Sequence, residues 1–129
     1  MTHMEIVIRG RRGTITVDGP LQADQTIAFI AEHYPTGAFD DALWDLRRSP
    51  LIHLMADELR RIADAVRAHS QARRRGRTVF VNNEDAGYGM LRMYTAYAEM
   101  EDVPATYYVC RTMEEAEAWL DQDPGPGPA

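Results

Sequence analysis

The sequence contains no lysine and only one cysteine among its 129 residues. A single cysteine, Cys110, excludes an internal disulfide and a thiolate metal cluster within one chain. No apolar run approaches the ~20 residues that a membrane span needs. The first residues lack the basic start and apolar core of a secretory signal, so we expect a cytoplasmic protein.

All 14 basic residues are arginines, which the codon usage of a GC-rich genome explains better than a functional demand. The net charge of -6 argues against general nucleic-acid binding. The charge is uneven, because arginines gather between residues 47 and 77 and acids dominate from residue 99 onward. The cluster Arg73-Arg74-Arg75-Gly76-Arg77 could contact the phosphates of an anionic membrane or of a nucleic acid. A solvated cluster at the negative end of a helix is the simpler interpretation.

Hydrophobic periodicity predicts an alternation of strands and helices. Residues 4–18 alternate in polarity around a turn rich in Gly and Arg, which is typical of a β-hairpin. Helical spacing follows Asp24, then Ser49-Pro50 (a serine cap and a proline at the first helical position), then the capping box at Thr112. The predicted elements are strands at 4–9 and 14–18, a helix from 24, a strand at 42–46, a helix at 49–70, a strand at 78–81, a helix at 85–100, a strand at 105–110 and a helix at 112–120.

This order predicts an α/β fold. Each strand after the hairpin is joined to the next through a helix, which makes these strands parallel with right-handed crossovers. The run 42–46 has the apolar character of a buried central strand. We predict the order β-β-α-β-α-β-α-β-α, with a mixed sheet of about five strands, parallel inner strands and packed helices. One domain should span residues 1–121, followed by a disordered Pro/Gly tail over residues 122–129.

Four stretches of the sequence resemble the SpoIIAA-like family of small bacterial proteins. They are residues 43–47 (LWDLR), 76–78 (GRT), 88–94 (YGMLRMY) and 109–120 (VCRTMEEAEAWL). The resemblance implies the fold shared by STAS and CRAL-TRIO domains. It also implies a regulatory role, because STAS proteins that antagonise anti-sigma factors are switched by phosphorylation of a serine in an Asp-Ser-Ser-Gly-like turn. The corresponding turn here runs from Asp45 to Pro50 without the paired serines or the glycine, so Ser49 matches the phosphorylated serine by position only. CRAL-TRIO domains bind lipid in a deep apolar pocket, for which this chain is small.

Ligands of open parallel sheets tend to bind beyond the carboxyl ends of the strands. Gly87 and Gly89 could let a small anion approach backbone N–H groups at the start of a helix. Alternatively, Asn83 or Asp85 caps that helix and the glycines allow close packing. The predicted ligand-binding residues are Asp45, Arg47, Ser49, Asn82, Asn83, Gly87, Tyr88, Gly89 and Arg92.

One face of the helix at 85–100 is rich in methionine and tyrosine. It is either an adaptable pocket wall or partner surface, or an ordinary face packed on the sheet. The residues at this spacing are Met90, Met93, Tyr94 and Tyr97.

Neither a catalytic set nor a metal site is evident in the sequence. The four histidines are isolated, so we expect no metal and no cofactor. We expect a non-catalytic STAS-like module that recognises a protein partner or a small anionic ligand, and that forms a homodimer through the hairpin or the Met/Tyr helix. Two alternatives stay open, a peripheral protein on an anionic membrane and a small enzyme that uses Cys110 or Asp45.

Overall fold

The computed structural model describes residues 1–73, 76–101, 103 and 105–122. Within these residues the order of strands and helices is the predicted one, with a short 3-10 helix η1 (Tyr34–Thr36) after the first helix. The elements are β1 His3–Arg9, β2 Arg12–Asp18, α1 Ala23–His33, β3 Asp41–Arg48, α2 Ala56–His69, β4 Arg77–Val81, α3 Asp85–Met100, β5 Thr106–Cys110 and α4 Met113–Asp121. No helix in the described part of the chain has the length and apolar character to cross a membrane.

The strands form one mixed sheet in the order β1-β2-β3-β4-β5. β1 and β2 are the antiparallel hairpin, and all later neighbours pair in parallel. β3 lies in the middle of the sheet and is buried from Ala42 to Leu46, as its continuous apolar run predicted. The predicted α/β class with parallel inner strands is therefore confirmed.

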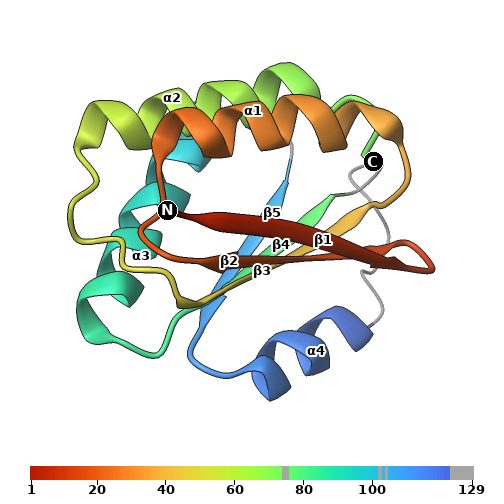
Figure 1. Cartoon of the computed structure of the whole chain (residues 1–129). Helices are drawn as coiled ribbons and strands as arrows, with labels where there is room; N and C mark the ends of the chain where they lie inside the picture. The colour runs from red at the N-terminus through yellow and green to blue at the C-terminus, as the bar shows by residue number, and fades with distance from the viewer. Residues whose placement is uncertain (74–75, 102, 104, 123–129) are drawn as a thin grey trace.

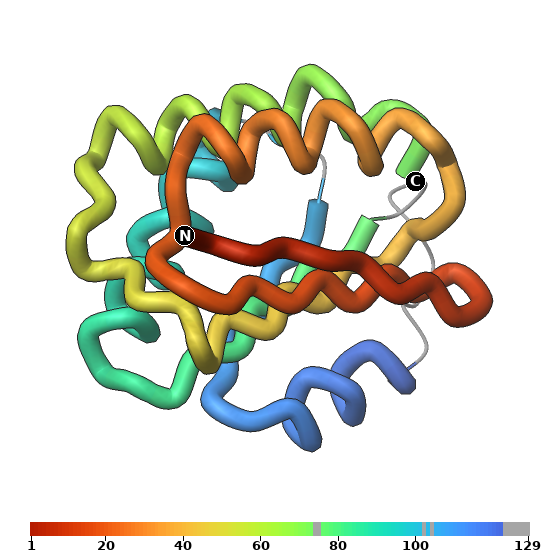
Figure 2. Tube along the Cα trace, in the orientation of Figure 1, coloured from red at the N-terminus to blue at the C-terminus, as the bar shows by residue number. Residues whose placement is uncertain are grey.

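α1, α2 and α3 cover one face of the sheet, and α4 covers the other (Figures 1 and 2). Because the strand order never reverses, each right-handed crossover places its helix, α1, α2 or α3, on the same face. α4 follows the last strand and packs on the opposite face, against β3, β4 and β5. The larger core lies under α1, α2 and α3, and the smaller one contains Leu43, Val79, Val81, Cys110, Ala116 and Leu120.

The predicted start of the second helix at Ser49-Pro50 is wrong. β3 runs on to Arg48, and α2 begins only at Ala56. The Ser49 hydroxyl does not cap a helix but donates to the carbonyl oxygen of Gly19 at 2.8 Å. At the true helix start, the backbone N–H of Met55 donates to the Glu58 carboxylate at 2.9 Å.

The proposed disordered tail, residues 122–129, lies outside the described residues except for Gln122. The Gln122 carbonyl oxygen accepts a hydrogen bond from Arg77 Nη1 at 2.8 Å. This bond ties the end of α4 to the first residue of β4.

Candidate functional site

The carboxyl ends of β3, β4 and β5 lie side by side. The strand register pairs Asp45 with Val81 and Val81 with Cys110. The loops that follow these strands therefore meet, as the sequence predicted. We call residues 45–55, 82–92 and 110–112 the carboxyl edge.

Asn82 holds the three strand ends together and is buried. Its backbone N–H donates to the Cys110 carbonyl oxygen at 3.1 Å, and its Nδ2 donates to the Leu46 carbonyl oxygen at 2.9 Å. Its Oδ1 accepts from the backbone N–H of Glu84 at 2.9 Å. Asn82 is thus hydrogen-bonded to β3, to β5 and to the loop that leads into α3.

The two glycines of α3 have different surroundings. Gly87 is buried against Asn82, whose Oδ1 would lie 2.4 Å from a Cβ added at this glycine. Gly89 is exposed, and a Cβ there would meet nothing within 4 Å. Close packing explains Gly87, whereas only Gly89 leaves its backbone open to solvent.

The start of α3 carries no side-chain cap. The N-cap residue is Glu84, and no side chain there accepts a capping hydrogen bond. Asn83 is exposed. The expectation that Asn83 or Asp85 caps this helix is therefore wrong.

Asp45 and Arg47 form a two-pronged ion pair on the edge. Arg47 Nε and Nη2 each donate to a different Asp45 carboxylate oxygen at 2.9 Å, and the Arg47 backbone N–H donates to Oδ1 at 3.2 Å. These bonds lower the pKa of Asp45 and raise the pKa of Arg47. Asp45 is therefore a carboxylate held by its neighbour, and Arg47 remains the exposed partner.

Ser49 is buried beside this pair in the chain. Its hydroxyl donates to Gly19, and its backbone N–H donates to the Leu46 carbonyl oxygen at 3.1 Å. In this conformation the hydroxyl points into the fold and does not form part of the exposed edge.

Two guanidinium groups lie near the Tyr88 side chain. The guanidinium carbon of Arg111 lies 4.5 Å from the centre of the Tyr88 ring, and that of Arg92 lies 6.0 Å away. Arg111 Nη1 also donates to Asp85 Oδ1 at 2.8 Å. Tyr88 and Arg92 were predicted ligand-binding residues, whereas Arg111 was expected only to lie on the same edge of the sheet. Its position directly after β5 was the available signal, because that places it on the same edge.

The loop before α2 exposes two large apolar side chains. Ile52 is 73% exposed and Met55 is 63% exposed. The residue before each of them, Leu51 and Leu54 respectively, is buried. The sequence predicts a helix over these residues, and for that reason Ile52 and Met55 were not among the predicted site residues. The carboxyl edge thus exposes two large apolar side chains three residues apart in one loop.

The predicted packing face of α3 is partly wrong. Tyr94 is buried as expected, but Met93 is 44% exposed. The residues that α3 buries are Gly87, Leu91, Tyr94, Thr95 and Ala98. Met93 therefore does not belong to the buried face of α3, although it directly precedes Tyr94.

The arginine cluster at residues 73–77 is not a solvated helix end where it is described. Arg73 is buried, and Arg77 Nη2 forms an ion pair with Asp41 Oδ2 at 2.7 Å in a mostly buried position. Residues 74 and 75 lie outside the described residues. Arg73 and Arg77 thus bind parts of their own domain.

Cys110 is buried at the end of β5. Burial, with a smaller contribution from Glu115, raises the pKa of its thiol to about 11. The Cys110 thiol is accordingly a weak nucleophile at neutral pH.

In the part of the chain that the structure describes, no three His, Cys, Asp or Glu residues come together in a way that could hold a metal ion.

We expect Cys110 to react slowly with iodoacetamide in the folded protein at pH 8. With a pKa of about 11, only roughly one thiol in a thousand is ionised at that pH, and the thiolate is the reactive form. The rate should rise as the pH approaches 11, and it should rise sharply in urea. Mass spectrometry of the alkylated protein measures this rate, with unfolded protein as the reference. Equal rates in folded and unfolded protein would contradict the buried position.

No family model matches the sequence, and no curated protein matches it. The fold, in contrast, is similar to that of solved structures. An anti-sigma factor antagonist from Mycobacterium paratuberculosis has a TM-score of 0.61 at 12% identity, over 95% of this chain and 96% of that one. The anti-sigma factor antagonist SpoIIAA in its unphosphorylated form has a TM-score of 0.54 at 17% identity, over 95% of this chain and all of that one. The chain therefore has the SpoIIAA-like fold that the resemblance in its sequence implied.

Proposed function

We propose that this chain is a non-catalytic regulatory module that binds a protein partner with its carboxyl edge. Two structures of similar fold are named as antagonists of anti-sigma factors, which are themselves proteins. Likeness of fold alone does not select a function. The composition of the edge supplies the second argument.

The edge combines exposed apolar side chains with exposed arginines. Ile52 and Met55 stand out from the loop, and Arg47, Arg92 and Arg111 are exposed on the same edge. Protein interfaces are enriched in methionine, aromatic residues and arginine, with apolar anchors surrounded by polar groups. The exposed Ile52 and Met55 are the observation that carries this proposal, because two large apolar side chains exposed three residues apart in one loop and bordered by arginines are suited to a protein interface.

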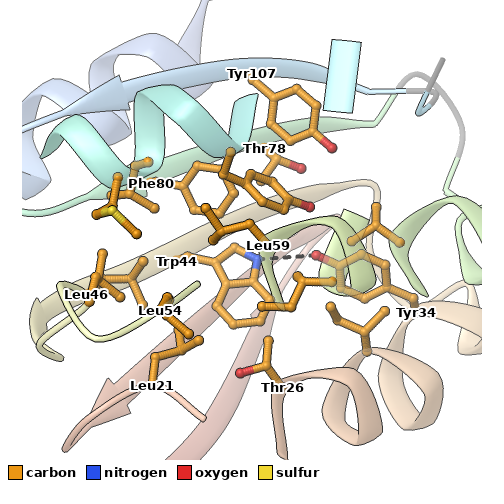
Figure 3. A pocket seen from close by; sticks show the side chains of 17 residues that line it. Leu21, Thr26, Tyr34, Trp44, Leu46, Leu54, Leu59, Thr78, Phe80 and Tyr107 are labelled. Atoms are coloured by element: carbon orange, nitrogen blue, oxygen red, sulfur yellow. Dashed lines mark hydrogen bonds between the residues drawn. The ribbon is translucent and has the colours of Figure 1, made fainter. Parts of the chain in front are cut away.

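The loop and the start of α3 share buried packing beneath the carboxyl edge (Figure 3). Leu51 and Leu54 of the loop line the same cavity as Met90 and Leu91 of α3. The buried leucines fix the backbone from which Ile52 and Met55 project. A partner with an apolar side chain flanked by carboxylates would fit this arrangement, with the carboxylates near the guanidinium groups around Tyr88.

The double substitution Ile52→Glu/Met55→Glu should abolish partner binding. We expect at least a ten-fold loss of one specific protein in affinity purification from the source organism, because central anchors contribute about 2 kcal/mol or more to binding. Quantitative mass spectrometry of the captured proteins measures the loss. Met100→Glu is the control, since Met100 is 79% exposed, more than Ile52 or Met55, but lies at the far end of α3.

The proposal would be contradicted if the wild type, the double variant and Met100→Glu captured the same proteins in the same amounts. It would also be contradicted if no captured protein were lost on substitution of Ile52 and Met55. A small anion bound by the guanidinium groups would give a different result. If the guanidinium groups bind a small anion, titration with inorganic phosphate should shift the NMR signals of Tyr88 both in the wild-type protein and in the double variant. Native mass spectrometry of the same samples tests for the proposed homodimer.

A further inference from the structure

β1 forms one edge of the sheet (Figures 1 and 2). It pairs with β2 on one side, and within the described part of the chain no strand pairs with its other side. An unpaired edge offers backbone N–H and C=O groups to another chain, and proteins often protect such edges with a proline, a bulge or a very short strand. β1 contains no proline, and its seven residues pair with β2 without a break in register. β5, at the opposite edge, has five residues.

The backbone groups of β1 alternate between its two sides. The hairpin turn has two residues, so the pair that flanks it, Arg9 and Arg12, exchanges both backbone hydrogen bonds. Counting back from this pair, the odd-numbered residues of β1 bond to β2. The N–H and C=O groups of Met4, Ile6 and Ile8 therefore point to the open edge, where another strand can bind them.

The side chains of β1 leave apolar surface at this edge on both faces of the sheet. On the side of the larger core, Ile6 is partly buried and Ile8 is 42% exposed. On the other side, Val7 is 50% exposed, because the helix of that face, α4, packs on β3, β4 and β5. The edge therefore offers both backbone groups and apolar side chains to a second strand.

The charges of β1 suit pairing with a second copy that runs in the opposite direction. A two-fold axis at Val7 places Val7 opposite its counterpart and Glu5 opposite Arg9 on either side of it. In this register Ile6 lies opposite Ile8, and these are residues whose backbone groups point outward, so the strands can also exchange hydrogen bonds. An axis at Glu5 would place two carboxylates opposite each other, and an axis at Ile6 would leave Glu5 opposite Val7.

Arg9 has no ion pair within the described residues. It lies opposite Arg12, whose guanidinium group already bonds to the Asp121 carboxylate at 2.8 Å. Glu5 of the same strand is four residues away, which is about 13 Å along an extended chain. A Glu5 carboxylate from a second copy would therefore supply the opposite charge that Arg9 lacks.

We infer that two copies of this chain pair through β1 in antiparallel orientation, with the two-fold axis at Val7. The two sheets then form one continuous sheet. Of the two dimer surfaces expected from the sequence, this interface uses the hairpin and not the helix rich in methionine and tyrosine. No residue of β1 belongs to the carboxyl edge, so the inference does not rest on the partner surface proposed above.

Exchanging the two charges tests this register. Glu5→Arg and Arg9→Glu each create two pairs of like charge across the axis, so each should raise the dissociation constant of the dimer about ten-fold or more in sedimentation equilibrium. Glu5→Arg/Arg9→Glu restores opposite charges and should return the constant to within about three-fold of wild type. Glu117→Arg makes the same change of charge as Glu5→Arg at an exposed position of α4, and should leave the constant unchanged.

Hydrogen exchange identifies the strand at the interface. At a concentration where wild type is dimeric, the amide N–H groups of Ile6 and Ile8 should exchange at least ten-fold more slowly than in Glu5→Arg. The N–H of Val7 bonds to β2 in both proteins and should change much less. A wild-type chain that is still monomeric at about 1 mM would overturn the inference. So would a dimer that leaves the Ile6 and Ile8 amides unprotected, or a double variant that dimerises no better than the two single ones.

Discussion

Replacing Gly87 with alanine is expected to lower the free energy of unfolding by about 3 kcal/mol. The new methyl group would lie 2.4 Å from Asn82 Oδ1 and 2.6 Å from its Cγ. Asn82 cannot yield easily, because its amide bonds to Leu46 and to Glu84 on two sides. Either α3 moves away from the sheet or the hydrogen bonds of Asn82 break. Urea unfolding followed by circular dichroism measures the loss.

Gly89→Ala is the matched control, two residues further along the same helix. Gly89 has open space around it, so the substitution should stabilise the protein by about 0.5–1 kcal/mol, as alanine favours the helix over glycine. The two substitutions add the same atom to the same helix and should act in opposite directions. If both stabilise the protein, the contact between Gly87 and Asn82 is not as close as the structure shows.

The contrast between these glycines shows what the sequence could and could not predict. Both glycines follow the same strand, and the local pattern gave each the same two interpretations. Only the position of Asn82, which bonds to Leu46 across the sheet, distinguishes them. Interactions between distant parts of the chain decide such differences, and a local pattern does not contain them.

The order and direction of the strands could be predicted because they depend on connectivity. A helix between two short apolar runs requires a crossover, and the crossovers are right-handed. The start of α2 could not be predicted in the same way. Ser49 and Pro50 have the local signature of a helix start, but the bond from Ser49 to Gly19 keeps them in a loop.

The candidate site was likewise predictable in outline. Topology alone brings the predicted residues to one edge, which the strand register confirms. Which side chains face solvent depends on packing, and so Asn82 and Ser49 turned out to be buried. The exposed pair Ile52 and Met55 was missed for the related reason that a loop took the place of a predicted helix.

Arg73→Met is the second substitution with a large expected effect, a loss of about 3–4 kcal/mol in the free energy of unfolding. Arg73 Nε and Nη2 donate to the Asp40 carbonyl oxygen at 3.0 and 2.9 Å, and Nη2 also donates to the Arg77 carbonyl oxygen at 3.0 Å. The guanidinium carbon lies 4.8 Å from the centre of the Tyr34 ring. Methionine keeps the bulk of the stem but supplies no donor. The substitution thus removes the group that joins the end of α2 to the starts of β3 and β4.

Two further variants distinguish this role from a general effect of lost charge. Arg73→Lys should recover only part of the stability, because an ammonium group cannot direct donors to several carbonyls in one plane as the guanidinium does. Arg48→Met removes an arginine that is 78% exposed and lies 3.9 Å from Asp18, and should change stability by less than about 0.5 kcal/mol. Urea unfolding of all three variants under the same conditions gives the comparison. Equal losses for Arg73→Met and Arg48→Met would mean that Arg73 is no more than another surface charge, whereas a large loss confined to residue 73 identifies it as the residue that holds the two strand starts to the helical layer.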